Sequence, residues 1–108
     1  YLELLEIIEE VRSKMKMGEY EDCKEMMNNA LQKYPHAPEP HNLYGLVLEG
    51  QGEHVLAMKH FRAAWALDPT YLPARYNLNS YGSFGNSNKG AFLEEDCPKL
   101  EECNLSKY

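Results

Sequence analysis

The stretch HNLYGLVLEGQGEHVLAMKHFRAAWALDP, residues 41–69, decides the fold class of this chain. Its apolar residues recur at steps of three and four on both sides of the glycine-containing segment 50–52, which is the pattern of two helices joined by a turn. The second helix ends before Pro69, because proline lacks the N–H that the helical hydrogen-bond ladder requires. Residues 41–69 therefore predict a pair of helices.

The same layout occurs once before, at a constant distance along the chain. Residues 18–35 contain a glycine, small residues and a terminal proline in the order found in residues 52–69. The equivalent pairs, all separated by the same offset, are Gly18/Gly52, Tyr20/His54, Cys23/Ala57, Met27/Phe61, Ala30/Ala64 and Pro35/Pro69. A fixed period of about 34 residues with two helices per period is typical of a stacked helical repeat and not of a compact bundle.

Helical periodicity and turn residues predict where each helix begins and ends. The expected helices cover residues 1–16, 19–33, from Pro38 or Pro40 up to the 50–52 turn, 53–67 and 72–80. A loop is expected over 81–88, where Gly, Ser and Asn dominate. Ala91 still keeps the frame of the repeat, but Pro98 excludes a full helix through its position. We therefore expect at most a short helix over 89–96 and one more turn over 98–103.

The residues of the second unit match a known repeat pattern. They read His41-x2-Tyr44-Gly45-x2-Leu48, then Ala57-x3-Phe61, Ala64 and Asp68-Pro69. This resembles the tetratricopeptide repeat family, whose pattern is Trp-x2-Leu-Gly-x2-Tyr, then Ala-x3-Phe, then Pro; the first unit is more degenerate but stays in register. The resemblance implies an all-α fold, with a short right-handed superhelix of two repeats, about 4–37 and 38–71. An incomplete third unit and an irregular C-terminal cap over 72–108 then complete a single domain of residues 1–108.

Small residues beside large ones in the fourth helix predict how the two helices of a unit cross. Ala57 and Ala64 lie seven residues apart on one face, where the close approach of two backbones needs small side chains. Phe61, on the same side, is expected to fill the space between the helices. Trp65 is expected to be largely buried against the following helix.

Charge and composition limit the classes of partner. The 108 residues have a formal net charge of −6 and are 44% hydrophobic, as in an ordinary soluble globular protein. Nucleic acid and anionic membranes favour clustered Lys and Arg, so we expect neither as a partner. No run approaches the ~18 apolar residues of a membrane-spanning helix. Three cysteines at wide, irregular spacing form a poor disulfide framework, which favours reduced thiols and a cytoplasmic location.

The side chains that carry chemistry form no recognised site pattern. Cys97 and Cys103, with four histidines, supply zinc-ligand types without the short spacings of structural zinc sites. Cys23 stands at a packing position, and the acidic neighbours of Cys97 and Cys103 disfavour the thiolate that a nucleophile requires. The glycine-rich residues 82–90 lack the phosphate-loop spacing. We therefore expect no catalytic residue, no metal site, no cofactor and a protein that is not an enzyme.

A binding surface remains as the source of function. Tetratricopeptide arrays hold peptides in a concave groove lined by the first helix of each unit, so the resemblance implies such a groove here. Its expected residues are Ile8, Arg12, Met15, Asn42, Leu46, Glu49, Tyr76 and Ser80. The positions of the family's carboxylate clamp are occupied by Ile8, Arg12, Leu43, Pro73 and Asn77, so that clamp is absent. The groove then favours apolar peptide side chains, oriented by Arg12 and Glu49.

Two other arrangements fit the same residues. They equally suit packing against the irregular C-terminal tail or against a second copy of the chain, because fewer than three complete repeats form a marginal array. The leading hypothesis is a non-catalytic protein–protein interaction module that binds a peptide. The alternative is a self-associating scaffold unit that buries its incomplete third repeat in a homodimer.

Overall fold

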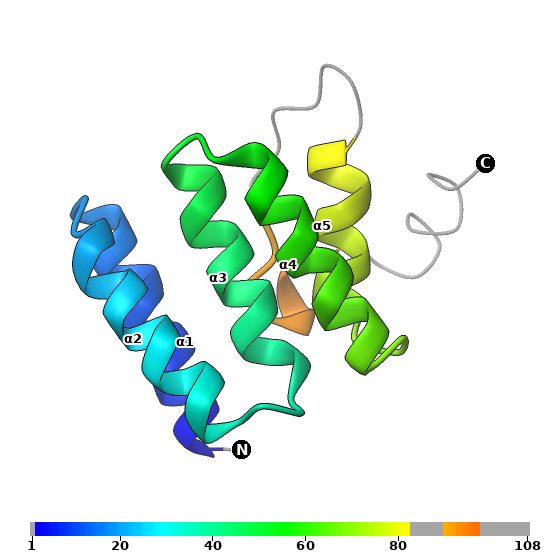
Figure 1. Cartoon of the computed structure of the whole chain (residues 1–108), viewed down its shortest axis with the longest axis horizontal. Helices are drawn as coiled ribbons and strands as arrows, with labels where there is room; N and C mark the ends of the chain where they lie inside the picture. Colours follow the sequence, from blue (N-terminus) through cyan, green and yellow to red (C-terminus); the bar gives the residue numbers. More distant parts are fainter. Residues whose placement is uncertain (1, 83–89, 98–108) are drawn as a thin grey trace.

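The computed structural model describes residues 2–82 and 90–97, and within these ranges all regular secondary structure is helical. The elements are α1 (Leu2–Lys16), α2 (Tyr20–Lys33), α3 (Pro38–Gly50), α4 (His54–Leu67), α5 (Leu72–Gly82) and the 3-10 helix η1 (Glu94–Asp96), shown in Figure 1. The expected all-α class is confirmed. The first four helices lie within one or two residues of their expected bounds, and α5 runs on past residue 80 to Gly82. The rest of the expected loop, and the expected turn over 98–103, lie outside the described residues.

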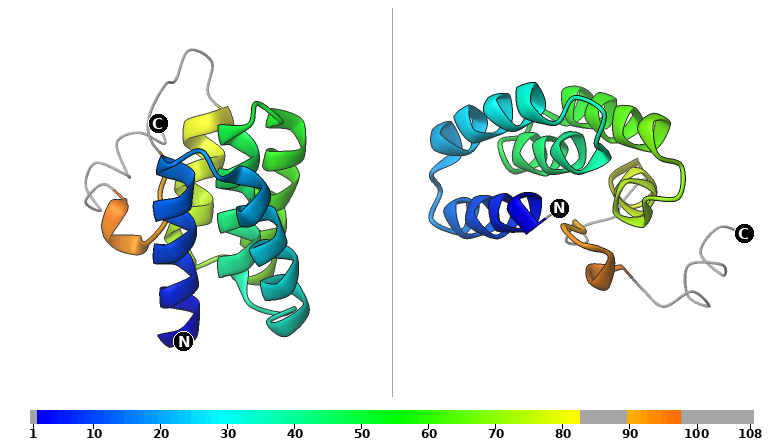
Figure 2. Two further views of the ribbon diagram at one scale, coloured as in Figure 1. Left: turned by 90° about the vertical axis from the view of Figure 1, so that its left-hand side faces the viewer. Right: turned by 90° about the horizontal axis from the view of Figure 1, so that it is seen from below.

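The helices form two layers (Figure 2). One layer contains α1, α3 and α5, and the other contains α2 and α4. Helix α3 is central, because it contacts each of the other four α-helices. We call the side of the α1–α3–α5 layer that faces away from α2 and α4 the inner face. Residues 90–97 lie on it.

The turn that follows α1 recurs after α3 with the same backbone hydrogen bonds. Gly18 and Gly52 have φ angles of 78° and 81°, a left-handed conformation that favours glycine. The N–H of Glu19 donates to the carbonyl of Lys14 at 3.0 Å, and the equivalent pair of the second unit forms the same bond at 2.9 Å. This bond closes a helix end in the Schellman arrangement. The repeat seen in the sequence is thus present in the backbone.

Helices α3 and α4 cross closely because small residues stand at their contact. Ala57 and Ala64 are fully buried, as expected from their spacing. Phe61 is also fully buried between the helices, and a Cβ atom on Gly45 would lie only 2.4 Å from its Cε1 atom. The glycine therefore lets the Phe61 ring lie against the α3 backbone.

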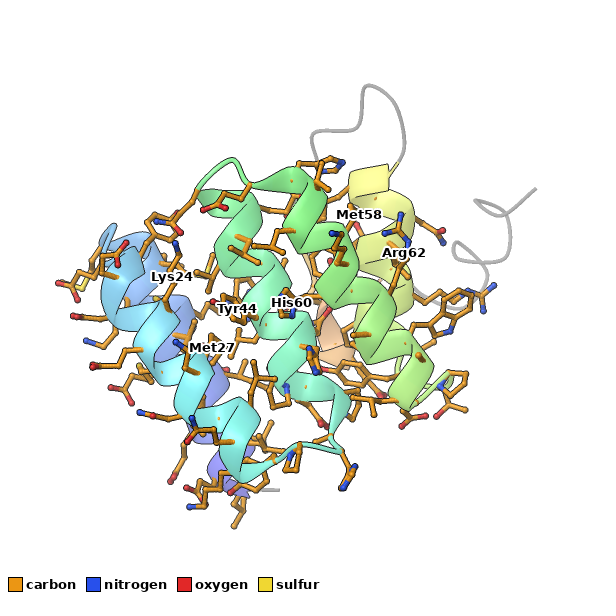
Figure 3. All side chains as sticks on the ribbon, viewed as in Figure 1. Lys24, Met27, Tyr44, Met58, His60 and Arg62 are labelled. Atoms are coloured by element: carbon orange, nitrogen blue, oxygen red, sulfur yellow. The ribbon has the colours of Figure 1, made fainter. Side chains whose placement is uncertain are left out.

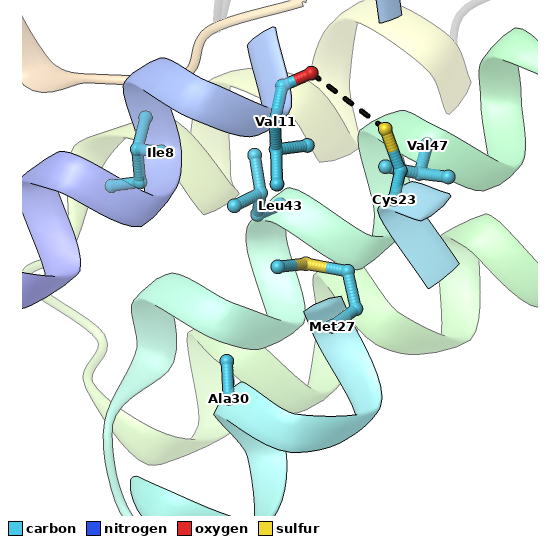
Figure 4. Packing of buried hydrophobic residues seen from close by; sticks show 7 residues of the cluster. All are labelled: Ile8, Val11, Cys23, Met27, Ala30, Leu43 and Val47. Atoms are coloured by element: carbon cyan, nitrogen blue, oxygen red, sulfur yellow. Dashed lines mark hydrogen bonds between the residues drawn. The ribbon is translucent and has the colours of Figure 1, made fainter. Parts of the chain in front are cut away.

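Helices α1, α2 and α3 share a second core, drawn in Figure 4. Val11, Met27 and Val47 are completely buried there. Cys23 belongs to the same cluster, and its thiol lies 3.7 Å from the Val11 carbonyl, to which it donates. Burial raises the pKa of the Cys23 thiol. The residue therefore packs as a small apolar side chain, as its position in the repeat predicts.

The expectation that Trp65 is largely buried is wrong. Its side chain is 42% exposed, and its indole N–H donates to the carbonyl of Pro69 at 3.2 Å. Helix α5 packs through Ala74 against Ala64, together with Tyr71. Trp65 lies one residue beyond Ala64 on α4, about 100° further around the helix, and so points away from this contact.

The helix in the C-terminal region is shorter than the upper limit of 89–96 that the sequence allows. Only Glu94–Asp96 form one turn, of the 3-10 type. The residue before it, Leu93, is extended, with φ −134° and ψ 164°. The backbone groups before η1 bond to side chains, as described below: those of Ala91 to asparagines of α3 and α5, and the N–H groups of Phe92 and Leu93 to Asp96.

Candidate functional site

The inner face is occupied by residues 90–97, which we call the 90–97 segment. It lies on the side of α1, α3 and α5 that faces away from α2 and α4 (Figure 2). Ala91 of this segment is completely buried although it lies outside any helix. A short non-helical stretch of chain is therefore enclosed by the helices at this point.

Two asparagines hold the backbone of Ala91. Asn77 of α5 accepts the Ala91 N–H at 2.7 Å through Oδ1 and donates to the Ala91 carbonyl at 2.9 Å through Nδ2. Asn42 of α3 donates to the same carbonyl at 3.0 Å. The Asn77 amide also donates to Asn42 Oδ1 at 2.8 Å, so both of its hydrogens are used. We call Asn42 and Asn77 the amide pair.

The amide pair recognises the main chain of its occupant. Both asparagines are buried, with 1% and 0% of their surface exposed. A buried amide left without a partner costs about 1–3 kcal/mol, so the bonds to Ala91 stabilise these two side chains. Every bond they make to Ala91 goes to its N–H or carbonyl, which any residue except proline offers in full. The hydrogen bonds of the pair are therefore made to the backbone of Ala91 and not to its side chain.

Arg12 of α1 binds the segment from the other side. Its guanidinium carbon lies 4.7 Å from the centre of the Phe92 ring, a cation–π contact. Its Nη1 lies 3.3 Å from the Asp96 carboxylate. Phe92 also packs against both of the main hydrophobic cores. Arg12 therefore joins an aromatic and an acidic side chain of the segment.

Asp96 shapes the segment as well as binding Arg12. Its Oδ2 atom accepts the backbone N–H groups of Phe92 and Leu93, each at 3.1 Å. These bonds turn the chain after the extended residues and start η1. One carboxylate thus fixes the local fold of the segment and its attachment to α1.

Gly90 enters the inner face at a point without room for a side chain. A Cβ atom there would lie 2.1 Å from Cδ2 of Leu46 and 2.8 Å from the Tyr81 hydroxyl oxygen. The Tyr81 ring stacks on Phe61, with ring centres 5.8 Å apart. Burial, followed by the nearby Glu49 carboxylate, raises the pKa of Tyr81. A neutral phenol and a buried leucine therefore bound the Gly90 position.

The structure brings only part of the expected groove into contact with a chain. Arg12 and Asn42 bind the 90–97 segment directly, and Leu46 adjoins Gly90. The other expected residues are distributed as follows: Ile8 is buried in the α1–α2–α3 core, Met15 packs beside both main cores, Ser80 is buried on α5 and Tyr76 is half-buried there. Glu49 lies beside the α3–α4 turn, where its carboxylate is 2.6 Å from Nδ1 of His54.

Sequence reasoning misses the decisive partner, Asn77, which it treats only as a position of a carboxylate clamp that the chain lacks. One feature of the sequence points to Asn77: it is a polar residue between the core residues Ala74 and Leu78 of α5. It also stands one repeat period plus one residue after Asn42. Two buried amides on neighbouring inner helices indicate a buried backbone partner. The pattern of α5 places Asn77 among core residues, but its backbone partner is seen only in the structure.

A second polar cluster lies on the outer side, between α3 and α4. Nδ1 of His41 and Nδ1 of His60 are 3.1 Å apart, and the His60 ring lies 4.5 Å from the Tyr44 ring (Figure 3). Burial lowers the pKa of both histidines, and the neighbouring His41 lowers the pKa of His60 further. One neutral ring donates and the other accepts, so the pair is a structural hydrogen bond between helices.

No metal-binding cluster accompanies these groups in residues 2–82 and 90–97, where no three His, Cys, Asp or Glu side chains are grouped to hold an ion. Within the same residues, no helix has both the length and the apolar character that crossing a bilayer requires. Comparisons of the chain with protein-family models, with curated proteins and with solved structures find no match.

Proposed function

We propose that this protein is a non-catalytic protein–protein interaction module whose inner face binds an extended peptide segment. The observation that carries the proposal is the amide pair, which bonds both main-chain groups of Ala91. Main-chain recognition of this kind is how extended peptides are held by a folded surface. The tetratricopeptide resemblance supports the same use of the same face.

The helical scaffold does not depend on the segment that now covers it. The buried members of the three core clusters all come from α1 to α5 and the turn before α5, and only Phe92 and Leu93 add to them from the segment. Displacement of the 90–97 segment therefore removes peripheral contacts and leaves the helix packing in place. A peptide from another molecule then has the same bonds to make.

The test is binding of a peptide in trans to a full-length chain whose own segment has been expelled. Ala91→Glu places a charge in a fully enclosed position and should release the segment without altering a helix. The labelled peptide GAFLEEDS, which copies residues 90–97 with Cys97→Ser, is titrated against this variant by fluorescence anisotropy. Saturable binding is expected.

A matched control removes the amide pair in the same background. Ala91→Glu with Asn42→Ala and Asn77→Ala should keep its helical circular dichroism and lose the peptide. If the folded Ala91→Glu chain binds no peptide, or if the asparagine substitutions leave binding unchanged, the proposal is wrong.

Self-association is a second candidate because of one surface. Trp65, Leu67 and Leu72, which flank the α4–α5 turn, are 42%, 40% and 41% exposed. Apolar side chains gathered at one end of a helix layer suit burial in a homodimer. Sedimentation of the wild-type chain against Trp65→Gln/Leu72→Gln tests this, and a wild-type monomer at all concentrations would remove it.

A further inference from the structure

The 90–97 segment passes three points on the inner face, and each restricts the side chain that fits there. The first is the amide pair. Ala91 is completely buried beside two asparagines that are bonded to each other at 2.8 Å. Because Ala91 has no exposed surface, a larger side chain would have to displace the residues that enclose it. Only a small residue fits, and it is preceded at Gly90 by a position where even a Cβ atom meets Leu46 and Tyr81.

The second point takes an aromatic side chain. The Phe92 ring has the Arg12 guanidinium at 4.7 Å, and it packs against the apolar side chains of both main cores. An aliphatic residue would keep the apolar contact but lose the attraction between the cation and the ring face. The position directly after the small residue therefore favours Phe, Tyr or Trp.

The third point takes a short carboxylate four residues after the aromatic one. Asp96 pairs with Arg12 at 3.3 Å and accepts two backbone N–H groups of its own segment at 3.1 Å. The neighbouring Glu94 and Glu95 are exposed. Glu at position 96 would carry its carboxylate one methylene further from those N–H groups, so Asp is favoured. Asn would keep an acceptor oxygen but lose the ion pair with Arg12.

We infer that the inner face selects partner peptides of the pattern Gly–small–aromatic–x–x–x–Asp, and that the 90–97 segment is a built-in copy of this motif that competes for the same site. This inference rests on the proposed function and names its ligand class. The chain's own segment has an effective concentration on the order of millimolar, as expected for a short connection. A partner therefore binds in proportion to the fraction of molecules whose segment is released.

Selection from a random peptide display library tests the motif. The bait is the full-length Ala91→Glu chain, and two further baits add either Asn42→Ala/Asn77→Ala or Arg12→Gln to it. The first bait should enrich a small residue directly before an aromatic one, with Asp four positions after the aromatic residue. The Arg12→Gln bait should keep the small residue, but it should weaken both the preference for an aromatic over an aliphatic residue after it and the preference for Asp over Asn, because Arg12 contacts both side chains. The bait without the amide pair should enrich nothing.

The affinities of four synthetic peptides measure the same preferences. Relative to GAFLEEDS, the peptide with Phe92→Ala should bind roughly ten-fold more weakly to the Ala91→Glu chain, and the peptide with Asp96→Asn roughly five-fold more weakly. The peptide with Ala91→Leu should not bind. Wild-type protein should bind GAFLEEDS at least ten-fold more weakly than the Ala91→Glu variant, because its own segment competes.

Failure of the motif and failure of the proposed function give different results. Equal binding of all four peptides, or enrichment of unrelated sequences through the amide pair, overturns the motif and leaves peptide binding standing. Absence of binding to a folded Ala91→Glu chain overturns both. Equal affinity of the wild type and Ala91→Glu overturns the competition. If Ala91→Glu does not fold, the four peptides are compared on the wild-type chain at millimolar concentration, where their order of affinity must be the same.

Discussion

The repeat spacing of the two helix pairs continues into the region after α5, but the backbone there has a different structure. Ala57 is fully buried where α4 crosses α3, and Ala91, which lies one repeat period later, is equally buried. Yet Ala57 is part of a helix packed by apolar neighbours, whereas Ala91 is part of a non-helical chain bonded to asparagines. The repeat therefore fixes where a small residue is buried, and the surrounding chemistry decides which backbone carries it.

The surrounding chemistry differs at two positions of the repeat. One period before Asn42 and Asn77 stand Ile8 and Leu43, both buried in the α1–α2–α3 core. In that core these positions meet apolar side chains, so they are apolar. Asn42 and Asn77 meet a bare backbone, so these positions carry amides. The change from apolar to amide marks where helix packing gives way to binding of a chain.

The largest expected effect comes from comparing one aromatic residue in each region. Phe61→Ala leaves a cavity between α3 and α4 and should lower the free energy of unfolding by about 3–5 kcal/mol. Phe92→Ala removes a half-buried ring from the segment and should lower it by about 1–2 kcal/mol. Urea unfolding followed by circular dichroism measures both.

The two variants should also differ in where they loosen the protein. Amide hydrogen exchange in Phe61→Ala should accelerate throughout α3, α4 and α5, whereas in Phe92→Ala only the backbone N–H groups of residues 90–97 should lose protection. Global loss of protection in Phe92→Ala would show that the segment is part of the core and not a bound chain.

The next largest effect tests the close packing of α4 at Ala64. Ala64→Leu adds three carbon atoms to a completely buried position and should lower the free energy of unfolding by about 1–3 kcal/mol. Ala66→Leu makes the same change on the exposed side of α4 and is the matched control. Its melting temperature should stay close to that of the wild type. Equal melting temperatures for both variants would contradict the close packing of α4 at Ala64, which clusters with Tyr71 and Ala74.

The sequence predicts those parts of the fold in which helical periodicity, turn residues and repeat spacing all indicate the same structure. The spacing of residues predicts the helix bounds and the turns at Gly18 and Gly52. It also predicts the burial of Ala57, Phe61 and Ala64. A glycine at a turn and a small residue at a regular interval each have few other structural roles, so these predictions are specific. The burial of Trp65 was predicted wrongly, because the spacing of residues shows which face of a helix they share but not the angle at which the next helix packs against it.

The candidate site was predicted only in part, for a related reason. Arg12 and Asn42 were placed on the correct face, since that face follows from the helical register. The occupant was not predicted, because residues 89–96 have a helical frame and the bonds that override it come from Asn77 and Asn42, distant in sequence. A long-range polar contact of this kind leaves no periodic signal.

Acidity should weaken the second helix pair more than the first. Burial holds the pKa values of His41 and His60 below the usual 6.5, so the unfolded chain takes up protons before the folded one as the pH falls. Their contribution to stability is complete above pH 6.5 and is lost as the pH falls through their lowered pKa values. The effect should be smaller than that of a core substitution, because both rings remain partly exposed.

The first helix pair supplies the control for this prediction. Ile7 and Met26 stand one repeat before His41 and His60, so His41→Ile/His60→Met gives the second pair the residues of the first. Urea unfolding of this variant should show a flatter dependence on pH between 7.5 and 5. The carboxylates of Glu3 and Asp68 do not interfere, because their pKa values are lowered from 4.5 and 3.8 and they titrate at lower pH. An unchanged slope in the variant would contradict the role of the histidine pair.

The smallest expected effect concerns Trp65, whose counterpart in the first pair is Leu31. Because the indole is 42% exposed and makes one hydrogen bond, to Pro69, Trp65→Leu should change the free energy of unfolding by no more than about 0.5 kcal/mol. Trp65 is the only tryptophan, so the fluorescence of the native chain reports on it alone. Its emission should resemble that of a solvated indole and be quenched by iodide, and the quenching should be the same in Phe92→Ala, since the inner face lies on the other side of the helix layers. Blue-shifted emission that iodide does not quench would mean that part of the chain covers Trp65 on α4. The region after α5 would then continue the helix packing of the first two pairs.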